Sequence, residues 1–190
     1  MQSNKKITFY PQLAQTSPEN TSYFEQFKGK SFEDFWNMLP KKLVYYSYEK
    51  ELAEITEKKR YVRVKKATGL GISEFYLRWI AWQCLNSKED SPDVFAVLVT
   101  GPRLELAVQL MERLKGLFNF QFDTKNTVCI INGRKIEAFP SHHLASARGL
   151  NPKIVLLDEA DFFPIGQQEE ARSVSERYIP KSNPYLKNLD

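Results

Sequence analysis

The chain has 190 residues, of which 42% are hydrophobic and 26% charged; these proportions fit a globular domain with one hydrophobic core and exclude collagen and a chain that is disordered throughout. Charged residues interrupt every long apolar stretch, so we expect no membrane-spanning segment. The first residues lack the apolar core of a secretory signal, so we do not expect secretion. The sequence has only two cysteines, which favours the reducing cytoplasm. The net charge of +4 permits a nucleic-acid partner without requiring one.

The start of the chain is predicted to form an arm and one short helix. Residues 1–20 are polar and contain two prolines, which favours a loose arm. Ser31 is followed three residues later by an acid, a pattern typical of a helix start, so residues 32–39 are expected to be helical. We therefore divide the chain into an N-terminal arm with its helix, residues 1–40, and a core, residues 41–190.

Beyond residue 40, helical and strand patterns alternate. Apolar residues at helical spacing predict helices over residues 45–58, 73–85, 103–118 and 167–178. Short apolar runs predict strands over residues 61–65, 94–100 and 154–157, and the Asn132-Gly133 pair predicts a hairpin between 128–131 and 135–139. This alternation predicts an α/β fold with a mostly parallel central sheet and one β-hairpin insertion.

The stretch from Lys41 to Lys66 is the most basic part of the chain, with nine Lys or Arg against four Glu. A solvated helix face is the simpler interpretation of such a run. Direct contact with DNA is the alternative, and both interpretations stay open at the level of sequence.

The turn after the strand at 61–65 has the spacing of a phosphate-binding loop. In the usual loop, G-x-x-x-x-G-K-[ST], backbone amides and a helix N-terminus surround the phosphates and one ammonium neutralises them. Gly71 and Ser73 stand at the second glycine and the hydroxyl position, and Lys66, which replaces the first glycine, can supply the charge from the strand end. Ser73 is expected to hold Mg²⁺ and to cap the following helix; the alternative is a plain strand-to-helix turn. The candidate nucleotide-binding residues are Lys66, Ala67, Thr68, Gly69, Leu70, Gly71, Ile72 and Ser73.

The apolar run at 154–157 ends in two acids, Asp158 and Glu159, and this pattern is typical of the second ATPase motif. The first acid would hold Mg²⁺, and the second would orient or deprotonate the attacking water. Because the carboxyl ends of parallel strands meet at one edge of a sheet, these acids are expected to lie near the phosphate loop. The alternative is a solvated strand exit, and Asp161 is expected to be a capping or surface acid.

Together these motifs resemble the ATPase domain of viral terminase large subunits, the motors that pump double-stranded DNA into capsids. The resemblance covers about residues 43–164 and rests on Lys-x4-Gly-x-Ser, Thr100-Gly101-Pro102-Arg103, Phe139-Pro140-Ser141, Arg148-Gly149 and the run LLDEADFF. A displaced phosphate-loop lysine is a habit of that family. The resemblance implies a P-loop NTPase three-layer sandwich that hydrolyses ATP with Mg²⁺.

The resemblance also implies roles and partners. Lys66 and Glu159 would be catalytic, Ser73 and Asp158 would hold the metal, and Arg148 would act as an arginine finger on a neighbouring subunit's ATP, although a loop salt bridge is the simpler interpretation of Arg148 from the residues alone. The implied partners are double-stranded DNA, a portal, a small terminase subunit and further copies of the chain in a ring, at the procapsid in the host cytoplasm.

Two features depart from the family pattern. The family often reads adenine with a glutamine after a tyrosine, and Tyr48-Glu49 occupies that place here, so Glu49 is a candidate base contact that can accept from the adenine amino group but cannot donate to N7. The sequence lacks the coupling motif and the nuclease domain, so we expect either a truncated core or a core whose missing parts lie on another chain. A helicase-like DNA-dependent ATPase and a non-catalytic nucleotide-binding remnant of a motor are the alternative functions.

Overall fold

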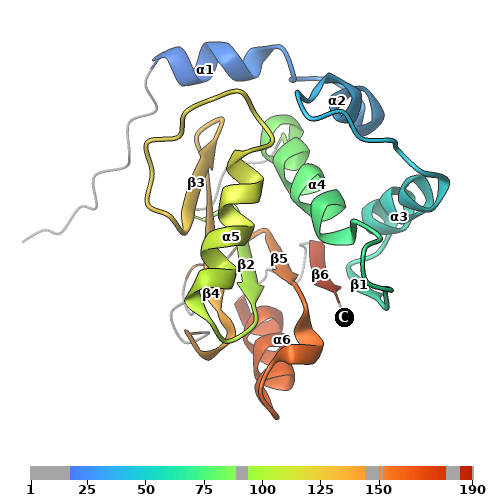
Figure 1. Ribbon diagram of the computed structural model, residues 1–190, viewed down its shortest axis with the longest axis vertical. Helices are drawn as coiled ribbons and strands as arrows, with labels where there is room; N and C mark the ends of the chain where they lie inside the picture. Colours follow the sequence, from blue (N-terminus) through green and yellow to red (C-terminus); the bar gives the residue numbers. More distant parts are fainter. Residues whose placement is uncertain (1–17, 89–93, 144–149, 151, 179–184, 190) are drawn as a thin grey trace, which may run out of the picture.

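The computed structural model describes residues 18–88, 94–143, 150, 152–178 and 185–189. Its helices surround one central sheet (Figure 1). In chain order the elements are α1 (Pro18–Glu25), α2 (Phe32–Met38), α3 (Ser47–Lys58), β1 (Tyr61–Val64), α4 (Ile72–Asn86), β2 (Ala96–Thr100), α5 (Leu104–Lys115), β3 (Val128–Ile131), β4 (Arg134–Pro140), β5 (Ile154–Leu157), the 3₁₀ turn η2 (Ala160–Phe162), α6 (Gln167–Tyr178) and β6 (Tyr185–Leu189).

The sheet has six strands in the order β1-β6-β5-β2-β4-β3. Every neighbouring pair is parallel except β3 with β4, the two arms of the predicted hairpin. β4 lies beside β2 in the sheet, so the hairpin extends the sheet at one edge. The parallel direction brings the carboxyl ends of β1, β2 and β5 to the same edge, which confirms the predicted arrangement.

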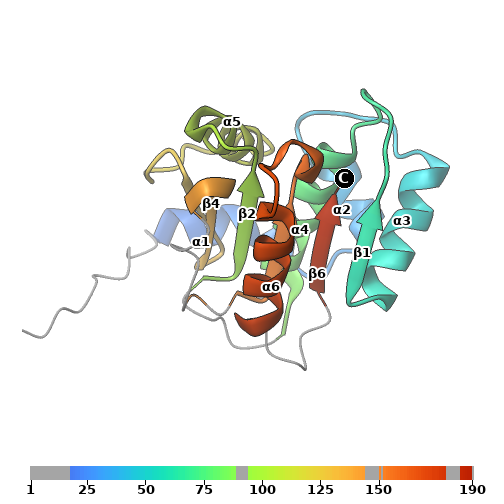
Figure 2. The same cartoon turned by 90° about the horizontal axis from the view of Figure 1, so that it is seen from below.

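Helices cover both faces of the sheet, and alternation along the strands explains why (Figure 2). In β2, Ala96 and Leu98 belong to the core cluster formed with α1 to α5. Val97 and Val99 belong to a second cluster that contains Ala171 of α6. Strands buried on both faces need apolar residues at successive positions, so the predicted three-layer α/β sandwich is confirmed.

The helices form largely as their patterns predict. Ser31 caps α2 by accepting a hydrogen bond from the Asp34 amide at 3.1 Å, and Phe35 and Trp36 are buried beneath it. α4 is apolar on nearly every side and is buried almost throughout. Both cysteines, Cys84 and Cys129, are buried core residues with free thiols.

Two elements were not predicted. The sequence of α1 is mostly polar, but its Tyr23 and Phe24 rings pack against the Phe118 ring. The distances from their centroids to the Phe118 centroid are 6.4 and 5.2 Å. β6 follows two prolines and pairs in parallel with β1 on one side and β5 on the other. Both elements depend on distant partners, which local patterns do not reveal. The loose arm was predicted for residues 1–20, and it is wrong for 18–20, which belong to α1. Residues 1–17 and the arginine finger predicted at Arg148 lie outside the described residues, and the boundary at residue 40 stays a prediction.

None of the helices described here is both long and apolar enough to cross a membrane.

Candidate functional site

The chain between β1 and α4 turns sharply through two glycines. Gly69 and Gly71 have φ angles of +88° and +73°, in the left-handed region that only glycine adopts without strain. Gly71 is the N-cap of α4 and leads directly into its first turn, at Ile72. The amides of that turn have no helical carbonyl to bond, so this helix end offers donors and a positive dipole to an anion.

Ser73 does not cap α4, so the expectation that it would do so is wrong. It lies inside the first turn, and its Oγ donates a hydrogen bond to Oδ1 of Asp158 at 2.8 Å. Both side chains are buried, at 7% and 6% exposure. The Asp158 amide donates to the Val99 carbonyl at 2.8 Å, which anchors the acid to β2. Ser73 is therefore not the capping serine of a plain turn, while the binding of phosphate by this loop stays a prediction.

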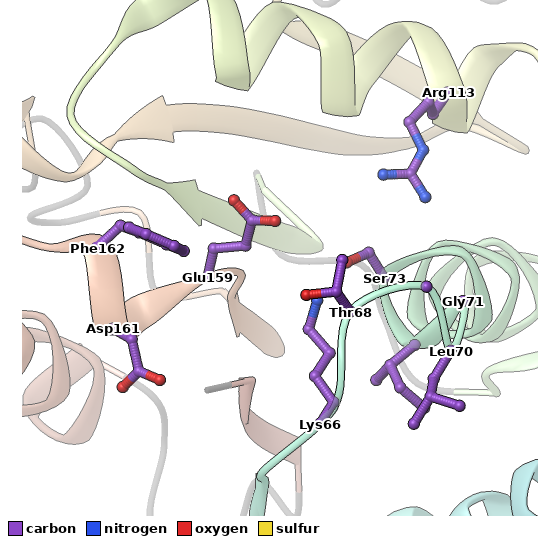
Figure 3. A pocket seen from close by; sticks show the side chains of 11 residues that line it. Lys66, Thr68, Leu70, Gly71, Ser73, Arg113, Glu159, Asp161 and Phe162 are labelled. Atoms are coloured by element: carbon purple, nitrogen blue, oxygen red, sulfur yellow. The ribbon is translucent and has the colours of Figure 1, made fainter.

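Ser73 lines a pocket of about 510 Å³, a size typical of small-molecule sites, and Asp158 lines an adjoining hollow of about 120 Å³. Side chains from two distant parts of the chain extend into the same space, Lys66 from the loop and Glu159 from the end of β5 (Figure 3). The lining residues are Lys66, Thr68, Gly69, Leu70, Gly71, Ile72, Ser73, Arg113, Glu159, Asp161 and Phe162. The structure therefore brings together every residue of the predicted loop except Ala67.

Glu159 has a backbone conformation that its residue type disfavours. Its φ and ψ are 55° and 44°, in the left-handed region, and it precedes the turn η2. This conformation costs about 1–2 kcal/mol for an L-residue with a side chain. Such strain is found most often at functional sites, where the surrounding fold holds it in place.

Three residues of the pocket were not predicted as functional. Arg113 comes from α5, and Asp161 and Phe162 come from η2. Asp161 is exposed, as expected of a surface acid, but it also borders the pocket. Phe162 is 73% exposed, unusual for an aromatic side chain at a pocket rim. No sequence motif marks Arg113, because it lies on the face of α5 opposite the apolar stripe.

Glu49 is placed away from the pocket lining. It is 4% exposed, and its Oε2 accepts a hydrogen bond from the Tyr46 amide at 2.9 Å, so it caps the start of α3. Burial raises the pKa of Glu49, while its hydrogen bond to Tyr46 and the charge of Arg78 oppose that rise. Contact between Glu49 and a nucleotide base stays a prediction.

The loop has a second anchor in α3. The phenolic oxygen of Tyr48 donates a hydrogen bond to the carbonyl of Leu70 at 2.8 Å, and its ring stacks on Tyr46 with a centroid distance of 5.5 Å. This bond joins the basic region to the phosphate loop.

Oxygen donors for a metal are few. Among the described residues no three His, Cys, Asp or Glu side chains gather closely enough to hold a metal ion by themselves. Ser73 and Asp158 nevertheless bring a hydroxyl and a carboxylate together at 2.8 Å. Mg²⁺ is commonly held by one or two protein oxygens plus water and substrate phosphates, so this donor pair fits Mg²⁺ at a phosphate site.

One comparison with a known protein supports the fold, the match to a solved phage terminase. No protein-family model and no curated protein matches the chain. Among solved structures, the large terminase of bacteriophage HK97 matches with a TM-score of 0.56 and 12% identity, over 78% of this chain and 33% of that one. S. cerevisiae Dbp5 bound to RNA and ADP BeF3 matches with a TM-score of 0.47 and 19% identity, over 72% of this chain and 40% of that one. The chain thus spans about a third of the terminase's length, and it shares with that protein a mixed α/β fold in which helices flank a mostly parallel sheet.

Proposed function

We propose that this chain is the ATP-hydrolysing motor domain of a machine that packages viral double-stranded DNA into a capsid. The observation that supports this most directly is the bond from Ser73 to Asp158, because Ser73 lines the same pocket as Lys66 and Glu159 and Asp158 lines the hollow beside it. A hydroxyl, an ammonium and two acids at a helix N-terminus are the groups that bind and hydrolyse a nucleoside triphosphate. Likeness in fold to a large terminase supports DNA packaging as the process.

In the proposed reaction, the amides at the start of α4 and the ammonium of Lys66 bind the phosphates. Ser73 and Asp158 would hold Mg²⁺, and the bound ion would neutralise phosphate charge. Glu159 accepts a proton from water as the water oxygen bonds to the γ-phosphorus. The bond from that phosphorus to the bridging oxygen breaks, and ADP and phosphate leave.

Two neighbouring lysines give a matched test of nucleotide binding. Lys66 is half-buried and lines the pocket, whereas Lys65 is exposed and does not line it. K66A is expected to weaken ATP binding at least tenfold, measured by calorimetry, because the phosphates lose their cation. K65A removes the same charge one residue earlier and should bind ATP like the wild type. Equal ATP affinity in K66A and wild type would overturn the proposal.

Coupling to nucleic acid is the second part of the proposal. Double-stranded DNA should stimulate phosphate release more than single-stranded DNA or RNA. Stimulation by single strands, with strand separation, would favour a helicase-like ATPase instead. ATP binding without phosphate release, at high protein concentration with DNA, would identify a non-catalytic remnant.

The proposed motor acts as a ring with a portal and a small terminase subunit, and Arg148 completes the site of a neighbouring subunit. Mixing R148A chains with K66A chains tests this last point. If Arg148 acts in trans, a mixed assembly regains phosphate release, because an intact K66A chain supplies Arg148 to an R148A chain that still binds ATP. No recovery would argue against a role in trans.

A further inference from the structure

Arg113 is a cation of the site that no motif marks. It lies in the last turn of α5, and its side chain borders the main pocket and also an adjoining hollow of about 120 Å³. Glu159 is the one other residue that lines both spaces. In Figure 3 the guanidinium reaches from α5 into the space above Ser73. Arg113 therefore faces the same end of the site as the acid proposed to activate water.

Arg113 is held by a single weak contact. Its Nη2 lies 3.5 Å from Oε2 of Glu74, at the long limit of a hydrogen bond. Glu74 follows Ser73 in the first turn of α4 and is 8% exposed. The side chain of Arg113 is 47% exposed, so its guanidinium is partly in solvent and free to change rotamer.

Glu74 forms ion pairs with two further cations, which remain when Arg113 moves away. Its Oε1 lies 3.4 Å from Nη2 of Arg78 and 3.6 Å from Nζ of Lys41. Arg78 is fully buried and stacks on Trp36 at 4.4 Å. Burial lowers the pKa of Arg78, and Glu74 opposes that shift. A buried carboxylate that loses its last partner is costly, but Glu74 retains Arg78 in either arrangement.

We propose that Arg113 is a positioning and specificity residue that exchanges Glu74 for the γ-phosphate of a bound nucleoside triphosphate. This inference rests on the proposed function of the same pocket. A guanidinium binds phosphate oxygens with two parallel hydrogen bonds that are shorter and stronger than its contact with Glu74. ADP lacks the γ-phosphate, so Arg113 distinguishes ATP from ADP. Because Arg113 leaves Glu74 only when ATP is bound, the contacts of Glu74 in α4 differ between the two states.

The test compares ATP and ADP affinities in the full chain by calorimetry. R113A is expected to weaken ATP binding at least tenfold and to leave ADP binding unchanged, since the charged hydrogen bonds to the γ-phosphate are lost. K41A is the matched control, because Lys41 contacts the same carboxylate but does not line the pocket, and both affinities should stay as in the wild type. R113K keeps the charge without the planar fork and should recover only part of the preference for ATP.

The outcomes separate the two proposals. If wild type and K65A bind ATP and K66A does not, while R113A and R113K keep the wild-type ratio of ATP to ADP affinity, the role of Arg113 is overturned and the proposed function stands. Equal losses of ATP and ADP binding in R113A would also overturn it, because they indicate general damage to the pocket. Absence of nucleotide binding in the wild type would overturn both.

Discussion

The hydroxyl of Ser73 and the carboxylate of Asp158 meet at 2.8 Å although 85 residues separate them in the chain. One belongs to the first turn of α4 and the other to the end of β5. Because both are buried, the bond fixes the loop against the sheet and leaves two oxygens side by side, between the pocket that Ser73 lines and the hollow that Asp158 lines. A single contact thus contributes to the fold and prepares the site proposed for Mg²⁺.

Replacing Asp158 should separate these two contributions. D158N keeps an oxygen that accepts from Ser73 and removes a buried charge, so the midpoint of thermal unfolding should not fall. Mg²⁺-dependent ATP binding should weaken, because a neutral amide is a poorer metal ligand. S73A is the companion variant. It leaves the Asp158 oxygen without its partner and should cost about 1–3 kcal/mol in unfolding free energy. A large stability loss in D158N would contradict this account.

Glu159 is expected to be needed for hydrolysis and not for binding. E159Q keeps the shape of the side chain but cannot accept a proton, so phosphate release should fall about 10²-fold or more while ATP affinity changes little. Single-turnover measurements with radiolabelled ATP, beside calorimetry on the same preparation, give both quantities. Wild-type turnover in E159Q would remove Glu159 from the mechanism.

The left-handed backbone at Glu159 leads to a prediction about stability. Glycine adopts φ of 55° without the clash of a Cβ atom, although it loses more backbone entropy on folding. E159G should therefore be at least as stable as the wild type and up to about 1 kcal/mol more stable, while being inactive. Urea unfolding of E159G and E159Q makes the comparison, since E159Q keeps the strain. An E159G chain less stable than E159Q would show that the side chain itself supports the fold.

Glu49 should make stability depend on pH. Burial raises its pKa, so the carboxyl is more readily protonated in the folded chain than in the unfolded chain. Its stabilising contribution is complete below the unfolded pKa of about 4.3 and is lost as pH rises through the higher folded value. E49Q is neutral at every pH and keeps an acceptor for the Tyr46 amide. The melting temperature of E49Q minus that of the wild type should therefore be larger at neutral pH than near pH 4.

The same variant tests the predicted contact with adenine. If Glu49 contacts the base, its carboxylate accepts from the adenine amino group and repels O6 of guanine, whereas the amide of E49Q can also donate to O6. The preference for ATP over GTP should therefore fall in E49Q. An unchanged preference would leave Glu49 with its role in capping α3 alone.

Tyr48 should influence nucleotide affinity through the loop. Y48F removes the hydrogen bond to the Leu70 carbonyl, which is worth about 0.5–1.5 kcal/mol, so ATP should bind about two- to tenfold more weakly. Y46F is the control, because Tyr46 shares the ring stack while the bond to Leu70 comes from Tyr48. Equal affinities in Y48F and Y46F would mean that this anchor does not order the loop for binding.

Local patterns were sufficient for most of the helices and strands. The helix at α2, the hairpin at Asn132-Gly133 and the buried strands β2 and β5 each have a signal within a few residues, because capping, turn geometry and burial act locally. The convergence of Lys66 with Glu159 also followed, since parallel strands have one carboxyl edge.

Other features depended on contacts that no local pattern contains. The aromatic residues of α1 pack against Phe118, which is distant in the sequence. β6 pairs in parallel with both β1 and β5 and lies between them in the sheet. Serine is a residue type that often caps helices, so the sequence favours that role for Ser73. Only the tertiary structure shows that its hydroxyl donates to Asp158 instead.

The sequence by itself determined the order of helices and strands, the mostly parallel sheet and the two motifs at its carboxyl edge, because propensity and hydrophobic periodicity act over a few residues. Only the tertiary structure decided that Arg113 lines the pocket and that Ser73 bonds to Asp158. It also decided that the Glu49 carboxylate accepts from the Tyr46 amide at the start of α3. The physical reason is that the direction of a polar side chain depends on the charges and hydrogen-bond partners that distant segments bring to it.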